Sequence, residues 1–282
     1  MSSITVNNLS FSYDGKTKAV DGLNFKVDEG EIFGFLGPSG AGKSTTIKLL
    51  TRLLVPSPDT VFLMGKDVSK IDYRFYKKIG ISFEGDVVYP TLTGLENLYY
   101  HAKLYGVSKE DIYKIMKTVD IYNAKDKKVS EYSKGMKTRL VLARAMVTDP
   151  KLLFLDEPTS GMDPEIASHI RGLLGEMNKR GTTMFLTTHD MHEAEELCDR
   201  IAFFNNGKII ETDTPASYKR RYGKNNVIVQ ANGEERVFNR ETEKEDLLTF
   251  LEKDDWSSIH SQEASLEEIF IKVVGRGLKG GE

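Results

Sequence analysis

The chain has 282 residues, of which 39% are hydrophobic and 29% are charged, an ordinary balance for a globular protein with a large core. Its formal net charge of −3 gives no reason to expect nucleic acid as the main partner. No apolar stretch approaches the roughly 18 residues that cross a bilayer, and the first residues lack the basic-then-apolar pattern of a signal peptide, so we expect a cytoplasmic protein.

A glycine-rich loop follows the first predicted buried strand, at residues 31–36. It fits the phosphate-binding pattern G-x-x-x-x-G-K-[ST] at every constrained position. Glycines let backbone N–H groups wrap around phosphates, and a helix that begins there adds the positive end of its dipole. We expect Lys43 to reach the β- and γ-phosphates of a nucleoside triphosphate and Ser44 to offer its hydroxyl to Mg²⁺. The predicted binding residues are Gly37, Pro38, Ser39, Gly40, Ala41, Gly42, Lys43, Ser44 and Thr45.

Two helix starts lie in the middle of the chain. Thr93 and Glu96 have the spacing of a capping box ahead of an aromatic-rich helix. Ser133 is a natural N-cap for the helical run that includes residues 139–146, and Gly135 leaves backbone amides open at that helix N-terminus. The second start therefore predicts another anion site, although Ser-x-Gly before a helix is common by itself.

An apolar run at residues 152–155 leads into Asp156 and Glu157 and predicts a buried strand of a parallel sheet. Because ligands collect at the carboxyl ends of such strands, we expect Asp156 to lie where Mg²⁺ needs a ligand. Glu157 projects differently and is placed to act as a general base on the attacking water. Without the phosphate loop, the same pattern would be an ordinary strand that leaves a core.

The next segment predicts a helix and another parallel strand. Asp163 and Pro164 mark a helix start, Gly181 ends it, and residues 182–187 form a strand pattern with His189 just past its end. His189 is thus expected to reach a γ-phosphate, although a histidine at a strand end is usually a solvated loop residue. The only cysteine, Cys198, excludes an internal disulfide, and we expect a buried thiol.

The last 60 residues differ from the rest in charge, since residues 223–282 carry a net −5 and residues 1–222 a net +2. Apolar alternation at residues 227–229 and 237–238 indicates short strands. Ser265 can cap a final helix with Glu268, and an apolar stripe on that helix indicates that it packs against something. We therefore place a domain boundary near residue 222.

These motifs, in this order, resemble the ATP-binding subunits of ABC transporters over nearly all of residues 3–222. The family's signature is Leu-Ser-Gly-Gly-Gln, and residues 132–136 keep its serine and its fourth-position glycine but depart at Tyr132, Lys134 and Met136. The resemblance implies an α/β fold of the P-loop NTPase type. This comprises a RecA-like core with a parallel sheet, an N-terminal antiparallel β subdomain, a helical subdomain at about 86–146, and a small α+β appendage at 223–282.

The resemblance also implies roles for single residues. Tyr13 would stack on adenine, although a hairpin tyrosine packed in a core would look the same. Glu157, His189 and Lys43 would be catalytic, His189 as the switch histidine. The remaining assignments are a signature that contacts the γ-phosphate held by another subunit and a loop that links the two sites of a dimer. These are Ser133, Lys134, Gly135 and Met136 for the signature, and Ser160, Gly161, Met162 and Asp163 for the dimer loop.

One position departs from the family at the loop that bridges nucleotide and membrane partner. Glu84 stands where glutamine is expected. A carboxylate can still ligate Mg²⁺, and more strongly, but it adds negative charge near the γ-phosphate. Our hypothesis is that Glu84 is a ligand or water-holder, so that Mg²⁺ would lie among Ser44, Asp156 and Glu84. The alternative is that the loop tolerates either residue.

The sequence as a whole predicts an ATPase that uses ATP and Mg²⁺, dimerises with a second ATPase subunit, expected to be another copy, and drives a separate transmembrane permease. The protein would lie at the inner face of the membrane through that permease. Residues 265–270 resemble a C-terminal segment of bacterial drug, antibiotic and polysaccharide exporters, which favours export. The alternative is a non-catalytic or weakly hydrolysing regulatory subunit, given Glu84 and the imperfect signature.

Overall fold

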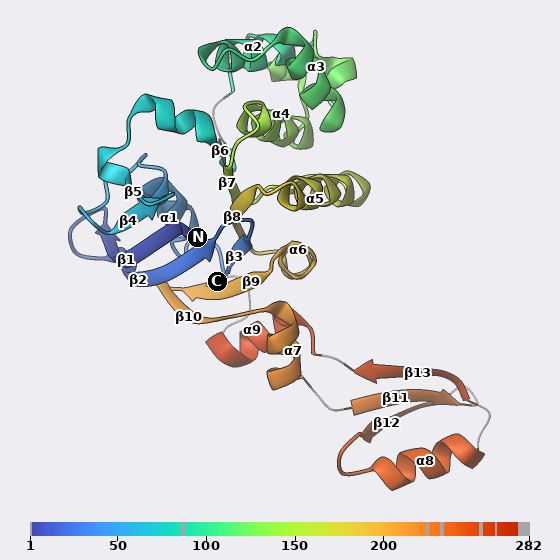
Figure 1. Ribbon diagram of the computed structural model, residues 1–282. Coiled ribbons are helices and arrows are strands. Elements are labelled where there is room, and N and C mark those ends of the chain that lie inside the picture. The colour runs from blue at the N-terminus through green and yellow to red at the C-terminus, as the bar shows by residue number, and fades with distance from the viewer. Residues whose placement is uncertain are drawn as a thin grey trace. The chain divides into compact units, whose positions relative to one another are not determined.

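The computed structural model describes residues 2–85, 88–223, 226–231, 234–253, 256–262 and 264–275. The chain divides into two compact units, with the division between Thr212 and Asp213. Figure 1 shows the elements of each unit. None of the described helices is long and apolar enough to cross a membrane.

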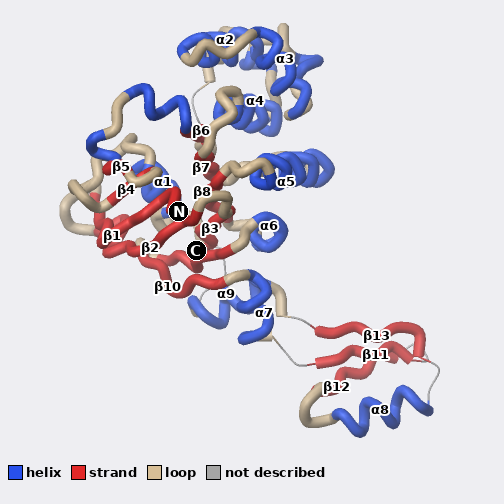
Figure 2. Tube along the Cα trace, viewed as in Figure 1, coloured by secondary structure: helices blue, strands red, loops and turns tan. Residues whose placement is uncertain are grey.

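The first unit is built on a six-stranded sheet in the order β10-β9-β3-β8-β7-β6, the red strands beside α4, α5 and α6 in Figure 2. Its neighbouring strands β9-β3-β8-β7-β6 run parallel. The strands of this sheet are β3 (Ile32–Leu36), β6 (Ile79–Ser82), β7 (Leu152–Asp156), β8 (Thr183–Thr188), β9 (Arg200–Asn205) and β10 (Lys208–Asp213).

Helices α4, α5 and α6 lie on one side of this sheet, and an antiparallel sheet together with α1 lies on the other (Figure 1). The antiparallel sheet has the order β2-β1-β4-β5. Its strands are β1 (Ser2–Ser12), β2 (Lys18–Asp28), β4 (Val61–Leu63) and β5 (Lys66–Asp67). The helices are α1 (Lys43–Leu50), α2 (Gly94–Leu104), α3 (Lys109–Thr118), α4 (Lys134–Met146), α5 (Pro164–Lys179) and α6 (Met191–Leu197), with short 3-10 turns at Val68–Lys70, Tyr73–Lys78, Tyr122–Ala124 and Val129–Glu131.

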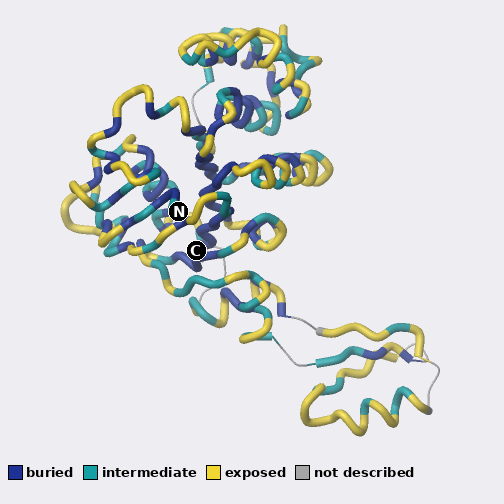
Figure 3. Tube along the Cα trace, in the orientation of Figure 1, coloured by how far each residue is buried: buried dark blue, intermediate teal, exposed yellow. Residues whose placement is uncertain are grey.

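Burial explains why the central strands read as continuous apolar runs. Every residue of β3, β7 and β8 is buried, as the dark blue strands of Figure 3 show. Phe33, Phe35 and Phe185 pack together between the two sheets, with ring centroids 4.8 to 6.1 Å apart. Covered on both faces, such strands need no polar alternation. The strands predicted at 31–36, 152–157 and 182–187 are confirmed, with ends that differ by one residue. Glu31, Glu157 and Thr182 lie outside the strands, and Thr188 belongs to β8.

The second unit has a three-stranded antiparallel sheet in the order β12-β11-β13. Its elements are α7 (Pro215–Tyr222), β11 (Asn226–Ala231), β12 (Glu234–Asn239), α8 (Lys244–Lys253), β13 (Trp256–Gln262) and α9 (Leu266–Val274). Ser265 and Glu268 form the predicted capping box, and Ile269 and Phe270 are buried. Gly233, within the predicted strand pair, lies outside the described residues.

Three local predictions in the first unit have clear outcomes. The capping box of Thr93 and Glu96 is confirmed at the start of α2. The Cys198 thiol is buried and unbridged. The helix expected after Asp163 is confirmed as α5, but the Asp163 side chain makes no cap hydrogen bond. Pro164 at the first helical position, with its preset φ, therefore marks this start.

Candidate functional site

The strand register brings three chain segments to one edge of the parallel sheet. Leu36, the last residue of β3, pairs with Thr188 at the end of β8, and Asp156 at the end of β7 pairs with Thr187. The three strands therefore end at the same level. The backbone N–H of Gly37 donates to the Thr188 carbonyl at 3.4 Å, which joins the glycine-rich loop to the end of β8.

The loop after β3 is a backbone cradle that side chains would obstruct. Gly40 and Gly42 have φ values of +78° and +108°, a region that residues with a Cβ rarely adopt. A Cβ on Gly42 would lie 2.2 Å from the Ala19 carbonyl oxygen, and one on Gly37 would lie 2.0 Å from that of Phe204. The loop thus presents backbone groups at the start of α1, where Ser44 and Thr45 form the first turn, a geometry suited to an anion.

Lys43 begins α1 and is buried, with a relative exposure of 6%. Its Nζ donates to the carbonyl oxygens of Gly37 at 2.7 Å and Pro38 at 3.1 Å, and lies 3.9 Å from Glu157 Oε1. Burial lowers the pKa of this ammonium, while the neighbouring carboxylates, Glu157 first, raise it. The loop carbonyls and Glu157 therefore position the Lys43 ammonium, the group that we expect to contact phosphate.

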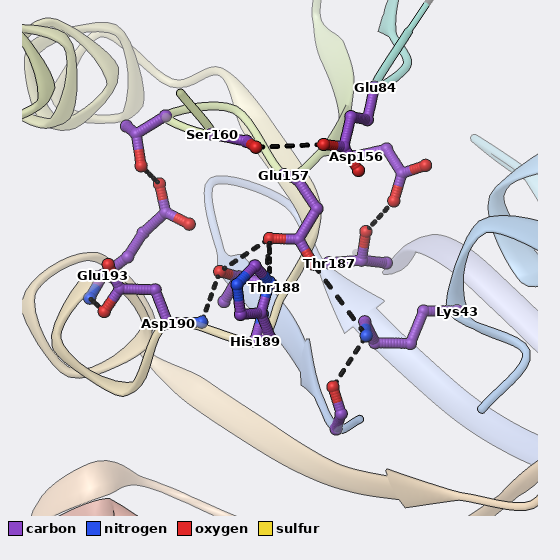
Figure 4. A network of polar contacts seen from close by, with 12 residues as sticks. Lys43, Glu84, Asp156, Glu157, Ser160, Thr187, Thr188, His189, Asp190 and Glu193 are labelled. Carbon is purple, nitrogen blue, oxygen red and sulfur yellow. Dashed lines mark hydrogen bonds and ion pairs between the residues drawn. The ribbon is translucent and has the colours of Figure 1, made fainter. Parts of the chain in front are cut away.

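Glu157 stands at the centre of the polar network in Figure 4. It has φ +51°, a strained backbone state for a residue other than glycine, and such strain is often found at functional sites. His189 Nδ1 lies 2.8 Å from Glu157 Oε2. Since a carboxylate only accepts, Nδ1 carries the proton in this contact. Beside it, the Thr187 hydroxyl donates to Asp156 Oδ1.

A second polar cluster joins two loops and the start of α4, three segments that the sequence did not predict to meet within one chain. Ser160 Oγ donates to Glu84 Oε1 at 3.0 Å, and Lys134 Nζ lies 3.4 Å from the same oxygen and 3.3 Å from Ser160 Oγ. Ser133 caps α4 as expected by accepting from the Met136 N–H. Lys134, at a signature position, thus offsets the charge of Glu84.

The remaining predicted residues lie around these two clusters. Tyr13 is 62% exposed, packs edge-to-face on Phe11 at 5.0 Å, and its hydroxyl lies 3.2 Å from Thr45 Oγ1. In the dimer-loop segment, Gly161 has φ +73°, and a Cβ there would come within 2.7 Å of the Lys134 side chain. Gly135 lies close to the Gly161 carbonyl as well, so the two loops pack closely.

Glu193 on α6 is a residue of this site that sequence reasoning missed. Its side chain is buried, with a relative exposure of 1%, and accepts from Thr159 Oγ1 at 2.8 Å. Burial raises the pKa of this carboxyl from 4.5 to about 7, and nearby Glu157 and Asp190 act in the same direction. It sits in a run of charged residues on a short helix, a pattern that gives no sign of burial.

This raised pKa predicts a pH-dependent stability. Between about pH 4.5 and about pH 7, the folded protein holds a proton on Glu193 that the unfolded chain has released. The stabilisation is therefore complete below about pH 4.5, declines over this range and is lost as pH rises through about 7. Glu193→Gln should therefore gain up to about 3 kcal/mol of unfolding free energy relative to wild type on going from about pH 5 to about pH 8. Denaturant unfolding of both proteins at the two pH values measures this difference. The same difference at both would contradict it, and the exposed neighbour Glu195→Gln should show no such gain.

Proteins of the ABC transporter family are similar to this chain. A family model described as ABC transporter matches residues 20–160. A fluoroquinolones export ATP-binding protein of Mycobacterium tuberculosis is 42% identical over 98% of this chain and 94% of its own length. The bacitracin transport ATP-binding protein BcrA of Enterococcus faecalis is 40% identical over 74% of this chain and 68% of its own length.

Solved structures agree with the sequence comparisons. The ATP-binding subunit of an ABC transporter covers 78% of this chain and 92% of its own chain, with 27% identity and a TM-score of 0.70. A dimeric bacterial ABC transporter cassette covers 75% of this chain and 98% of its own, with 25% identity and a TM-score of 0.70. The chain has the phosphate cradle and the carboxylates at the strand ends, and a relative 42% identical to it matches almost its whole length. It therefore belongs to the ATP-binding proteins of the ABC transporter family.

Proposed function

We propose that this protein binds and hydrolyses ATP in a dimer with a second ATPase subunit and thereby drives export through a separate transmembrane permease. The observation that carries this proposal is the common strand edge, which gathers Lys43, Asp156, Glu157 and His189 around the end of the phosphate cradle. Export is supported by relatives named for it, a fluoroquinolones export protein and a Nod factor export protein of Burkholderia lata.

The residues at this edge fit a magnesium ion. The Ser44 hydroxyl at the start of α1 and the Asp156 carboxylate would supply hard oxygen ligands. Among the described residues, no group of three His, Cys, Asp or Glu side chains could hold a metal by itself. A site with few protein ligands suits Mg²⁺, which keeps waters and shares phosphate oxygens. When bound, Mg²⁺ would neutralise charge that develops on the phosphates.

The protein's own groups then have distinct tasks in hydrolysis. The backbone amides after Gly37 and the Lys43 ammonium would bind the phosphate oxygens. Glu157, held by His189 and opposed to Lys43, would orient a water and accept its proton as the water attacks the γ-phosphorus. His189, with Nδ1 bound to Glu157, would present Nε2 to the γ-phosphate. Tyr13, exposed beside Thr45, would stack on adenine.

We place the rest of the site in a second subunit. In this proposal, residues 133–136 contact the γ-phosphate bound by the partner, and residues 160–163 link the two sites of the dimer. ATP would then bridge two chains, and hydrolysis would remove the bridge. A dimeric ABC cassette among the structural neighbours supports this arrangement. The proposed permease contact is the pocket lined by Tyr89, Tyr100 and Leu104, all largely exposed. Residues 1–222 would form the ATP-binding domain and 223–282 an accessory domain.

Phosphate release from the purified chain tests the proposal against the non-catalytic alternative. We expect ATP hydrolysis that EDTA abolishes and Mg²⁺ restores. ATP binding without any hydrolysis, with and without the permease present, would favour the regulatory subunit. Affinity purification from membranes should bring down a polytopic membrane protein, and a soluble homodimer with no membrane protein under any nucleotide condition would contradict the transporter role.

Glu84 gives a further prediction for the metal. If Glu84 ligates Mg²⁺ directly or through water, Glu84→Gln should raise the Mg²⁺ concentration for half-maximal hydrolysis by about tenfold. Lys134→Met keeps the carboxylate and removes the ammonium that pairs with it and with Ser160 Oγ, so this variant should not raise that concentration. Unchanged Mg²⁺ dependence and rate in Glu84→Gln would show instead that the loop tolerates either residue.

A further inference from the structure

Glu84 is a third carboxylate at the edge of the sheet where Lys43 lies. Strand β6 ends at Ser82 and pairs in parallel with β7, so the loop that carries Glu84 leaves the sheet at the same edge as Asp156. Burial lowers the pKa of the Lys43 ammonium. The carboxylates of this edge raise it, Glu157 first and then Asp156 and Glu84. Glu84 is therefore close enough to attract the ammonium that phosphate must reach.

The contacts of Glu84 are nevertheless made with other groups. Glu84 Oε1 accepts from Ser160 Oγ at 3.0 Å, as Figure 4 shows, and lies 3.4 Å from Lys134 Nζ. Among the ion pairs between described residues, the one that Lys43 makes is with Glu157, at 3.9 Å. Glu84 thus acts on Lys43 through space while its carboxylate is bonded elsewhere.

The loop at residues 160–161 guides the Lys134 side chain to Glu84. A Cβ on Gly161 would lie 2.7 Å from Lys134 Cδ and 3.0 Å from Cε, so the lysine stem lies against this glycine. Lys134 Nζ lies 3.3 Å from Ser160 Oγ. One turn along α4, the Thr138 hydroxyl donates to the Ser160 carbonyl at 3.3 Å, which ties the helix to the same loop. The place of the ammonium is therefore set by packing, although the side chain is 66% exposed.

We propose that Lys134 is a positioning residue for ATP in its own chain, because it holds the Glu84 carboxylate away from Lys43. The inference rests on the ATP site proposed above. It adds a role within one chain to a segment that the same proposal assigns to the partner's nucleotide. Without Lys134, Glu84 would lose its cation and turn toward Lys43, whose burial strengthens the attraction. ATP would then have to displace a carboxylate before its phosphates could contact the Lys43 ammonium.

ATP binding by the full chain in EDTA tests the inference, because chelation of Mg²⁺ leaves no metal for Glu84 to bind and prevents hydrolysis. The Kd of a fluorescent ATP analogue should rise by about three- to fivefold in Lys134→Met, the scale of a partly exposed ion pair. Lys134→Arg keeps the charge and should bind like wild type. Lys151→Met is the control for net charge. Lys151 is exposed and lies about 16 Å along β7 from Asp156, so this variant should also bind like wild type.

The Glu84→Gln background separates this role from a direct contact between Lys134 and ATP. Glutamine offers Lys43 no charge, so adding Lys134→Met to Glu84→Gln should change the Kd by less than about twofold. An equal rise in both backgrounds would show that Lys134 attracts the phosphates by itself and would overturn the inference. An unchanged Kd in Lys134→Met alone would overturn it too, and in both cases the wild type still binds ATP. A wild type that binds no ATP would contradict the proposed function, and this inference with it.

Discussion

Glu157→Gln is expected to lower the rate of ATP hydrolysis by at least about a hundredfold and to leave ATP bound. The carboxylate is the proposed base, and glutamine has its shape without its basicity. Its backbone strain and its contact with His189 should survive, because glutamine can still accept a hydrogen bond through its carbonyl oxygen. Phosphate release and equilibrium ATP binding, measured on the same preparation, separate the two effects.

Such a variant should also trap the dimer. If ATP bridges two subunits and hydrolysis removes the bridge, Glu157→Gln with Mg²⁺-ATP should run as a dimer in light scattering and return to monomer when ATP is removed. The exposed Glu165→Gln, on the first turn of α5, is the matched control and should hydrolyse ATP like wild type. Equal rates in wild type and Glu157→Gln would remove Glu157 from the chemistry.

The parts of this site that could be predicted from sequence are those fixed by local rules. The glycines before Lys43 are required by backbone geometry, and buried parallel strands read as apolar runs that end where ligands bind. These rules and the order of the motifs were enough to predict that Lys43, Asp156 and His189 lie close together. Strand register then brought them to one edge.

The missed contacts depend on how separate segments pack. Glu84, Lys134 and Ser160 come from two loops and the start of α4, far apart in the sequence, and no periodicity relates them. Lys134 departs from the family signature and Glu84 departs from the family glutamine, yet the structure pairs these two departures. Glu193 was missed for a different reason, since burial of a single carboxylate on a seven-residue helix leaves no pattern to detect.

Lys43→Met should abolish measurable hydrolysis by a different route, through loss of ATP binding. Removing one member of a buried, hydrogen-bonded charge pair costs at least about 2 kcal/mol, so the Kd for ATP should rise by about thirtyfold or more. Without the ammonium, Asp156 and Glu157 would face the triphosphate uncompensated. A fluorescent ATP analogue measures the Kd, and Lys48→Met, a half-buried lysine on the same helix, is the control and should bind normally.

The two variants together test whether Lys43 and Glu157 oppose one another before ATP arrives. The 3.9 Å pair is made by side chains that are 7% and 11% exposed, and ATP must draw the ammonium towards its phosphates. Glu157→Gln removes this competition, so it should bind ATP more tightly than wild type, whereas Lys43→Met binds it less tightly. If the double variant binds ATP as weakly as Lys43→Met alone, the gain in Glu157→Gln acts through Lys43. A double variant that keeps the full gain would show that Glu157 repels ATP directly and that its pairing with Lys43 has no effect on binding.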